Sequence, residues 1–307
     1  MRAAFVETLT QVAAENPRVI LLTADLGFQI FDEFQARFGR RYVNVGVAEA
    51  QLVCAAAGLA LEGWRPVTYS IASFHVSRPY EQLRISVSYP QLPVVVVGVG
   101  GGYGYAHNGV THHAVNDFAL MCSMPGMAVV APGDANEVAQ LLPQTLQLPG
   151  PCYVRIGRGN EPSVPAPTPA ILGHARLLTD GERVAVLSTG DMASVVLEAL
   201  AHLQSERIFP LAYQMHTIRP LDTATLDELA AKVHTILTIE EHSPDGGLTA
   251  AVSAWLLTRA RTLRLMRLGP PGDFALGNLH PHDLRHRLNY DAESIAEACR
   301  SAWKAPS

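Results

Sequence analysis

The sequence is poor in charge and in cysteine, and these shortages exclude several classes of protein. Only 17% of its 307 residues are charged, the net charge is -5 at pH 7, and no basic run occurs. A nucleic-acid-binding surface is therefore not expected. The cysteines are far apart and form no Cys-x-x-Cys pair, which favours buried free thiols in a reducing compartment. They are Cys54, Cys122, Cys152 and Cys299.

Long apolar runs are also absent. No stretch approaches the roughly 18 uncharged residues of a membrane span. The N-terminus, MRAAFVETLTQ, lacks the apolar core and the small-residue cleavage site of a signal peptide. With 48% hydrophobic residues in 307 positions the chain can bury a large core, so we expect a cytoplasmic protein of about two domains.

The glycine-rich stretch after residues 93–99 lacks both common phosphate-binding patterns. In the dinucleotide pattern Gly-x-Gly-x-x-Gly, Gly98 and Gly100 fill the first two places, but Tyr103 occupies the third. No helix is expected to start promptly after these glycines. The Gly-Lys-Ser/Thr ending of a P-loop is missing as well. The sequence therefore disfavours a nicotinamide, flavin or P-loop site.

What the sequence does contain is an alternation of short apolar runs with helical patterns. The runs 18–24, 93–99 and 184–188 are bounded by polar residues, as expected of buried parallel strands. Helical spacing separates such runs, and one helix is expected over residues 74–88. The alternation predicts an α/β fold with two doubly wound domains, whose mainly parallel sheets are covered on both faces.

A proline-rich segment divides the alternating pattern. Four prolines fall within a short span that can form neither helix nor sheet, and such a segment is typical of an extended linker. They are Pro162, Pro165, Pro167 and Pro169. We therefore predict one domain at residues 1–160, a linker at 161–175 and a second domain at 176–307.

The stretch from Tyr42 to Glu62 contains the most informative carboxyl group. Glu49 stands where an unusually apolar helix begins, and the next twelve residues carry no charge. A carboxyl group in apolar surroundings can stay protonated and act as an acid or a hydrogen-bond donor. The alternative is an ordinary acidic residue in the first turn of a helix, favoured by the helix dipole.

The loop at residues 100–116 gathers polar, titratable side chains beyond a buried strand. His107, Thr111, His112 and His113 lie beside flexible glycines, so the loop is a candidate for a site. The alternatives are a pair of surface histidines and a zinc site. Zinc is disfavoured, because it needs three or four ligands and no cysteine belongs to this cluster.

Several motifs in a fixed order identify a family. Asp25-Leu26, NVGVAEAQ (44–51), RPYEQLR (78–84), GVTHHAVNDFALM (109–121) and RIGRGN (155–160) resemble the transketolase family. MHTIRPLD and TIEEHSPDGGL, from the second half, are similar to its C-terminal domain. The resemblance covers the pyrimidine-binding and C-terminal domains of that family, which is essentially the whole chain.

The resemblance implies thiamine diphosphate as cofactor. In the family a protonated glutamate hydrogen-bonds N1′ of the aminopyrimidine ring, and the cofactor serves as electron sink after C–C cleavage. Glu49 matches that glutamate, and Phe74 matches an aromatic residue that covers the pyrimidine. Tyr80 matches another aromatic of the pocket, and Asp25 an acidic position near the cofactor. From the residues alone, Phe74 can also be a core side chain and Asp25 a helix N-cap.

The resemblance also implies a substrate site for a ketose. His112 matches the histidine of the family's Gly-x-Thr-His motif, which contacts the carbonyl or hydroxyl region of the sugar. Arg158 matches an arginine that binds a sugar phosphate, and Arg2 matches a second one. The planar fork of arginine suits phosphate oxygens. The alternative for each arginine is a surface ion pair.

The sequence departs from the family pattern at the substrate. His107-Asn108-Gly109 replaces Glu-Asp-Gly, so the amide Asn108 stands where an aspartate contacts a substrate hydroxyl. A further loop histidine is missing, and Gly100 to Gly102 stand in that region. We place His107 and Asn108 at the substrate and expect a donor or acceptor different from the sugar phosphates of central metabolism.

One absence points to a partner. Thiamine diphosphate enzymes hold the diphosphate through Mg²⁺ and a Gly-Asp-Gly motif, which this sequence does not contain. We therefore expect no metal ligands in this chain. The Mg²⁺ ligands should lie on a second subunit, in an α2β2 assembly, as in a split transketolase.

Three functions remain open at this point. The first is transfer of a two-carbon ketol unit by a two-component, transketolase-like enzyme. The second is decarboxylative, either acyloin synthesis of the deoxyxylulose-phosphate type or the beta subunit of a 2-oxo-acid dehydrogenase. The third is a non-catalytic assembly partner that keeps the fold without the chemistry.

Overall fold

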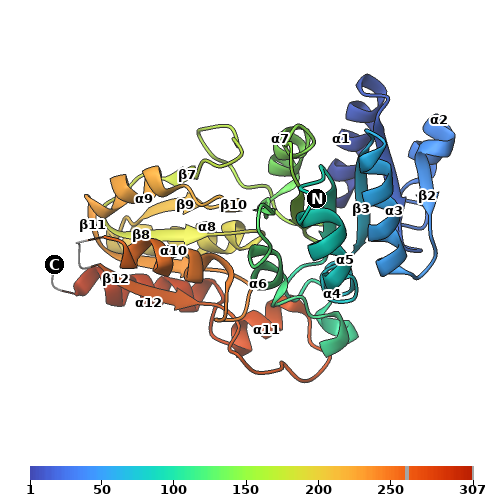
Figure 1. Cartoon of the computed structure of the whole chain (residues 1–307). Coiled ribbons are helices and arrows are strands. Elements are labelled where there is room, and N and C mark those ends of the chain that lie inside the picture. The colour runs from blue at the N-terminus through green and yellow to red at the C-terminus, as the bar shows by residue number, and fades with distance from the viewer. Residues whose placement is uncertain (260–262, 306–307) are drawn as a thin grey trace.

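The strands in residues 1–259 and 263–305, the part of the chain that the computed structural model describes, form two sheets (Figure 1). The first sheet has seven strands in the order β10-β5-β6-β4-β3-β1-β2, and the second has five in the order β12-β11-β8-β9-β7. Helices cover both sheets, and in Figure 1 the two α/β units lie side by side. The predicted fold class, two α/β units with mainly parallel sheets, is confirmed.

The first sheet is parallel except for one edge strand. Its strands are β1 (Val19–Thr23), β2 (Tyr42–Asn44), β3 (Arg65–Ile71), β4 (Val95–Val99), β5 (Ala128–Val130), β6 (Cys152–Ile156) and the antiparallel β10 (Thr217–Arg219). The helices of this unit are α1 (Arg2–Glu15), α2 (Asp32–Phe38), α3 (Glu49–Leu61), α4 (Ala72–Ser77), α5 (Tyr80–Gln82), α6 (Asp117–Cys122) and α7 (Ala135–Thr145).

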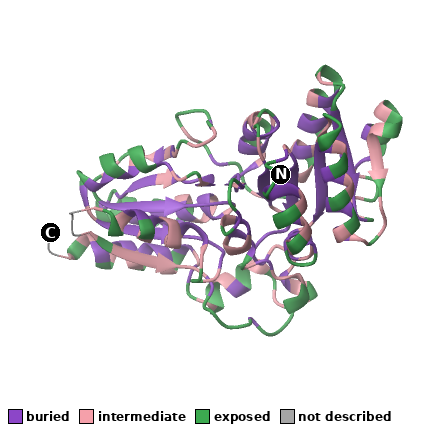
Figure 2. Ribbon diagram, viewed as in Figure 1, coloured by how far each residue is buried: buried purple, intermediate pink, exposed green. Residues whose placement is uncertain are grey.

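The two faces of the first sheet carry separate hydrophobic cores because successive side chains of a strand point to opposite faces. Leu21 of β1 belongs to the core beneath α1 and α7, whereas Leu22 belongs to the core beneath α3 and α6. A strand buried on both faces is apolar at every position, which explains the continuous runs in the sequence. Figure 2 shows the buried strands between helices whose outer faces are exposed.

The second sheet repeats this arrangement. Its strands are β7 (Arg176–Thr179), β8 (Arg183–Ser188), β9 (Leu211–Gln214), β11 (Val233–Ile239) and β12 (Arg264–Leu268), and only β7 is antiparallel to its neighbour. Its helices are α8 (Met192–Leu203), α9 (Thr223–Ala230), α10 (Gly247–Leu257), α11 (Pro281–Arg287) and α12 (Ala292–Lys304). Helices α8 and α12 cover one face, and α9 and α10 cover the other.

One detail of the chain order differs from a simple division into halves. Residues 157–175 contain no strand or helix, as a linker would, but β10 lies beyond them and pairs with β5 of the first sheet. The second half of the sequence therefore completes the edge of the first sheet.

No helix in the described residues is long and apolar enough to cross a bilayer.

The helix predicted over residues 74–88 is present but interrupted. The structure has α4 at Ala72–Ser77, a break at Arg78-Pro79, the short α5, and a π-helix at Leu83–Ser88. Proline has no N–H to continue the helical hydrogen bonds and clashes with the preceding turn. The break falls at Arg78, the C-cap residue of α4.

Candidate active site

Several predicted site residues lie at one edge of the first sheet. Asp25 follows β1, Glu49 follows β2, Phe74 follows β3 and Arg158 follows β6, while the glycine-rich loop follows β4. Because parallel strands end at the same edge of a sheet, segments far apart in the sequence meet there. The topology thus explains why these side chains come together.

Glu49 forms a group with an arginine and an aromatic ring. It is the first residue of α3, and only 5% of it is exposed. Both of its oxygens accept hydrogen bonds from Nη1 of Arg78, at 2.8 and 2.9 Å. The same guanidinium lies 4.1 Å from the ring centroid of Phe74. The buried carboxyl group is thus occupied by an ion pair, and a ligand reaches its oxygens only if Arg78 moves away.

His112 connects this group with the glycine-rich loop. Its ring centroid lies 5.0 Å from that of Phe74 and 6.2 Å from that of Tyr105. Its Nδ1 lies 3.0 Å from Oγ1 of Thr111. Partial burial, followed by the nearby charges of His107 and Arg78, lowers the pKa of His112 below its usual value. A neutral imidazole can both donate and accept a hydrogen bond at neutral pH.

A cavity of about 570 Å³ opens beside Phe74 and Arg78. The loop around Thr111 forms one side of it, and Asp245 and residues 271–275 of the second domain form another. Its volume lies within the roughly 300–1,000 Å³ of small-molecule sites. A flat ring could therefore enter against the face of Phe74 that Arg78 occupies.

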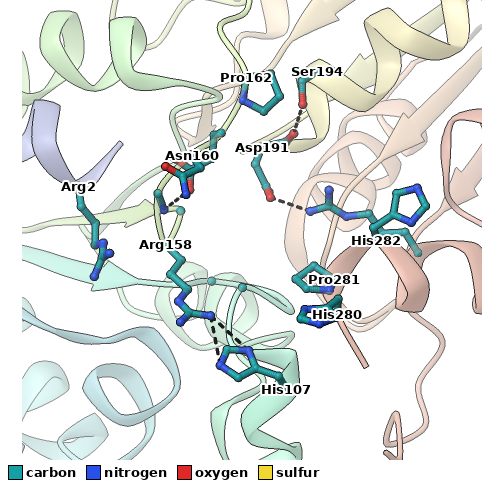
Figure 3. Close-up of a pocket in the computed structure, with 16 residues that line it drawn as sticks. Arg2, His107, Arg158, Asn160, Pro162, Asp191, Ser194, His280, Pro281 and His282 are labelled. Carbon is teal, nitrogen blue, oxygen red and sulfur yellow. Dashed lines mark hydrogen bonds and ion pairs between the residues drawn. The ribbon is translucent and has the colours of Figure 1, made fainter. Parts of the chain in front are cut away.

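A second cavity, of about 670 Å³, holds the predicted arginines (Figure 3). Arg2, His107 and Arg158 line it from the first domain. Nη1 of Arg158 lies 3.2 Å from both ring nitrogens of His107, and its guanidinium lies 5.1 Å from the ring centroid of Tyr105. The contacts of Tyr105 with His112 and with Arg158 link this cavity to the Glu49 group.

A buried polar network fixes the glycine-rich loop between the two domains. Arg155 pairs with Asp117 at 3.3 Å and donates to the carbonyl oxygen of Glu241 at 3.0 Å. The Glu241 carboxylate accepts a hydrogen bond from the backbone N–H of Tyr103, at 2.9 Å. The other oxygen of Glu241 accepts from Arg285 at 2.8 Å. The loop is thus held on both sides by ion-paired, buried groups.

The sequence matches two family models that together span most of the chain. Residues 1–163 match the pyrimidine binding domain of transketolase, and residues 173–295 match the transketolase C-terminal domain. The chain belongs to the transketolase family. The match also makes 1–163 the pyrimidine-binding part, which contains every site residue predicted from the sequence.

Two kinds of relative are similar to this chain. The chain is 31% identical to one of the subunits of an apulose-4-phosphate transketolase from Phocaeicola vulgatus, over 98% of this chain and 96% of that protein. It is 34% identical to a 1-deoxy-D-xylulose-5-phosphate synthase from Chlorobium luteolum, over 98% of this chain and 48% of that protein. The chain therefore spans about half the length of the synthases that it matches.

Solved transketolase structures share the fold. A chain described as "Split gene transketolase, inactive beta4 tetramer" superposes with a TM-score of 0.90 at 31% identity, with 98% of this chain and 97% of that chain covered. Transketolase from Leishmania mexicana superposes with a TM-score of 0.82 at 17% identity, over all of this chain and 46% of that one. At that identity the second match shows the fold alone.

The departure from the transketolase pattern at Gly100 to Gly102 has a steric reason. A Cβ atom added at Gly100 would overlap the Tyr105 ring, and one added at Gly101 would overlap the Arg155 side chain. Gly100 and Gly102 also have φ values of +68° and +59°, which favour glycine. The space in which we expected a family histidine is therefore filled by Tyr105 and Arg155.

The remaining predicted residues form no hydrogen bond or ion pair with Glu49 or Arg78 within the described residues. The hydroxyl of Tyr80 lies 2.8 Å from that of Ser123, and its ring packs against the core beneath α3. Asp25 is exposed and accepts a hydrogen bond from the Asn44 amide at 3.2 Å. Asn108 is exposed beside His107. Cofactor or substrate contacts for these three residues stay predictions.

Sequence reasoning missed three residues of the site. Arg78 was visible within the RPYEQLR motif, but no pattern indicated that it would pair with Glu49. Tyr105 lies within the glycine-rich loop, where its role as a link between His112 and Arg158 follows only from the fold. His280 of the second domain lines the larger cavity, and no sequence signal joins it to the first domain.

The Glu49 group fits the pyrimidine half of thiamine diphosphate. A buried carboxyl group and an aromatic face beside a cavity are the two features that an aminopyrimidine ring requires. No group of His, Cys, Asp or Glu side chains that could hold a metal ion occurs within the described residues.

Proposed function

We propose that the chain is one component of a two-component enzyme that uses thiamine diphosphate to move a two-carbon ketol unit from a phosphorylated ketose to an aldehyde. The observation that carries the proposal is the continuous line of side chains from Glu49 to the 670 Å³ cavity. It brings a buried carboxyl group, an aromatic face and a histidine near a pair of arginines. Cofactor binding, carbonyl chemistry and phosphate binding need these groups together.

Each residue of the cofactor end has a distinct role in this proposal. Glu49, once released from Arg78, holds a proton toward N1′ of the aminopyrimidine ring. Phe74 packs against the ring and excludes water from one face. Asp25 and Tyr80 contact the cofactor in this proposal, as their match to the family pattern implies. When bound, thiamine diphosphate supplies the electron sink for the carbanion formed by C–C cleavage.

The substrate end binds the sugar in this proposal. His112, neutral at pH 7, donates to or accepts from the carbonyl or hydroxyl region of the ketose. Arg158 and Arg2 bind the phosphate, and His107 supports Arg158 at 3.2 Å. Asn108, an amide in place of an aspartate, contacts a sugar hydroxyl and contributes to the choice of substrate.

A partner subunit completes the enzyme. The relative from Phocaeicola vulgatus is itself named as one subunit of a transketolase and matches this chain over nearly its full length, which supports the same role here. The description of the split-gene transketolase chain as an inactive β4 tetramer supports the need for a second component. We propose that the partner carries the Gly-Asp-Gly motif and the Mg²⁺ ligands, in an α2β2 assembly.

A decarboxylative reaction is the second candidate. The 1-deoxy-D-xylulose-5-phosphate synthase from Chlorobium luteolum matches at 34% identity, slightly above the 31% of the apulose-4-phosphate transketolase chain. Such an enzyme would release CO2 from pyruvate, whereas ketol transfer releases none. An enzyme with a 2-oxo-acid dehydrogenase beta subunit would also release CO2. A non-catalytic partner would support neither CO2 release nor ketol transfer.

Reconstitution tests the proposal. The chain is combined with a candidate partner polypeptide that carries a Gly-Asp-Gly motif, and cofactor binding is measured by calorimetry. We expect the complex to bind Mg-thiamine diphosphate and to move a two-carbon unit between a phosphorylated ketose and an aldehyde. Tight binding by the isolated chain would contradict the split site, and CO2 release from pyruvate would favour the second candidate.

A further inference from the structure

We propose that His280 of the second domain contacts the phosphate of the sugar substrate, so that the C-terminal domain is itself part of the substrate site. This inference rests on the function proposed above and deepens it. None of the sequence motifs includes His280, and it lies beyond the linker from every residue assigned to the site so far. Four features of the larger cavity support the inference.

The first feature is that both domains build the walls of the 670 Å³ cavity. Arg2, His107 and Arg158 come from the first domain, whereas Ser194 and His280 come from the second. In Figure 3, Arg2 and Arg158 lie on one side and His280 on the other. A ligand held by the arginines therefore faces the second domain.

The second feature is the charge balance of the cavity. Among the ion pairs of residues 1–259 and 263–305, neither Arg2 nor Arg158 has a carboxylate partner. The two carboxylates in the lining are already satisfied: Glu161 by the N-terminal ammonium group at 2.8 Å, and Asp191 by Arg285 at 2.7 Å. Two unpaired guanidinium groups in one cavity provide a site for a doubly charged anion.

The third feature is the position of His280 relative to the arginine. Its ring centroid lies 6.5 Å from that of His107, with the two rings 29° from parallel. His107 in turn contacts Arg158 at 3.2 Å. The three side chains form a row across the domain boundary, and an imidazole N–H at its end can donate to a phosphate oxygen.

The fourth feature is that the second-domain wall is held in place. Arg285, one helical turn beyond Pro281, donates to Asp191 at 2.7 Å and to Glu241 at 2.8 Å. Glu241 also accepts from the N–H of Tyr103, which belongs to the loop that carries His107. These contacts hold α11 in place, and His280 is the N-cap residue of that helix.

These features select a phosphate monoester of a small sugar as the ligand. The two negative charges of the phosphate balance the two arginines. A phosphate oxygen that the arginines leave free can accept a hydrogen bond from a neutral or protonated imidazole. A volume of about 670 Å³ accommodates a sugar phosphate, since small-molecule sites span roughly 300–1,000 Å³. The proposed role is binding and specificity, not bond making or breaking.

The test compares His280→Ala with a matched control in the reconstituted complex. His286→Ala changes a histidine of α11 that is exposed, pairs with Asp291 at 2.7 Å and does not line the cavity. For His280→Ala we expect KM for the phosphorylated ketose to rise about tenfold, the effect of losing one hydrogen bond to a charged group, with kcat unchanged. KM for the ketose without phosphate should not change, and His286→Ala should match wild type for both substrates.

A binding measurement separates this inference from the proposed function. Titration of the complex with inorganic phosphate should show weaker binding in both His280→Ala and Arg158→Ala. If only Arg158→Ala weakens phosphate binding, the role of His280 is wrong and the proposed phosphate site stands. If neither variant changes phosphate binding or the preference for phosphorylated ketose, the phosphate site itself is wrong. An equal rise in KM for both ketoses would also overturn the role of His280.

Discussion

The two ends of the site differ in how their charges are satisfied. At the acid end, formed by Glu49, Arg78 and Phe74, the carboxylate has a counter-ion 2.8 Å away. At the arginine end, formed by Arg2, His107 and Arg158, neither guanidinium has a carboxylate partner within the described residues. The charge of the acid end is therefore balanced without a ligand, whereas the charges of the arginine end are balanced only when an anion binds.

The two ends also differ in which domains build them. The acid end lies within the pyrimidine-binding domain, and its motif follows the transketolase pattern. The arginine end lines a cavity that both domains build, and the departures from the pattern at Gly100 and Asn108 lie near it. Under the proposed function, cofactor chemistry lies in one domain and substrate choice lies where the domains meet.

Replacement of the acid is expected to have the largest effect. Glu49→Gln keeps the shape but cannot hold or release a proton, so we expect kcat of the reconstituted complex to fall about a thousandfold or more. The fall in kcat is measured as turnover of a phosphorylated ketose. The matched control is Glu62→Gln, at the exposed C-terminal end of the same helix, which should stay within about twofold of wild type. Equal turnover in Glu49→Gln would mean that the acid end has no part in catalysis.

The pH dependence of stability tests the burial of a histidine next to the acid end. His75, next to Phe74 in α4, is fully buried; its Nδ1 lies 2.9 Å from the Val97 carbonyl oxygen, and burial lowers its pKa to about 4. In the unfolded chain His75 binds a proton as the pH falls through about 6.5, whereas in the folded chain it stays neutral down to about pH 4. His75 therefore contributes stability that is complete above about pH 6.5 and is lost as the pH falls toward 4, at about 1.4 kcal/mol per pH unit.

Denaturant unfolding of the chain between pH 7 and pH 4 measures this slope. Burial also lowers the pKa of His216 to about 4, and it lowers the pKa values of His242, His112 and His113, so further contributions of the same sign are present. We expect His75→Gln to reduce the slope without abolishing it. His202→Gln, at an exposed position of α8, should leave the slope unchanged. A slope that His75→Gln does not alter would contradict a buried neutral imidazole at this position.

Two identical substitutions of glycine should have opposite effects. Gly101→Ala places a methyl group against the Arg155 side chain, and we expect a loss of about 1–3 kcal/mol in the free energy of unfolding. Gly58→Ala, within α3 and with open space around it, should gain about 0.5–1 kcal/mol. Chemical denaturation of the chain measures both. If Gly101→Ala is tolerated as well as Gly58→Ala, the loop at the arginine end is not tightly packed.

Much of the acid end could be predicted because its signals are local. A single carboxyl group at the start of an apolar helix indicates a buried acid, and Glu49 is indeed buried at the first position of α3. Phe74 and Arg158 match family motifs, and in the structure they follow β3 and β6, whose parallel ends lie at one edge of the first sheet.

The missing parts of the site depend on contacts that no periodicity encodes. Arg78 points to Glu49 because Pro79 interrupts the helix expected over 74–88, and the direction of a side chain at a break cannot be deduced from spacing. His280 reaches His107 through the packing of two domains. Strand β10 shows the same limit, since a three-residue segment of the second half pairs with the first sheet.

The smallest expected effect compares the two ends directly. Arg78→Met removes the counter-ion of Glu49; because Arg78 is 47% exposed, we expect a loss of only about 1 kcal/mol in the free energy of unfolding. Arg158→Met removes an arginine without a carboxylate partner, so its effect should stay within about 0.5 kcal/mol. Denaturation of the isolated chain at pH 7 measures both. In Glu49→Gln, Arg78→Met should cost less than in wild type, because the paired acid is already gone. Equal losses from Arg78→Met and Arg158→Met would remove the distinction between a paired end and an unpaired one.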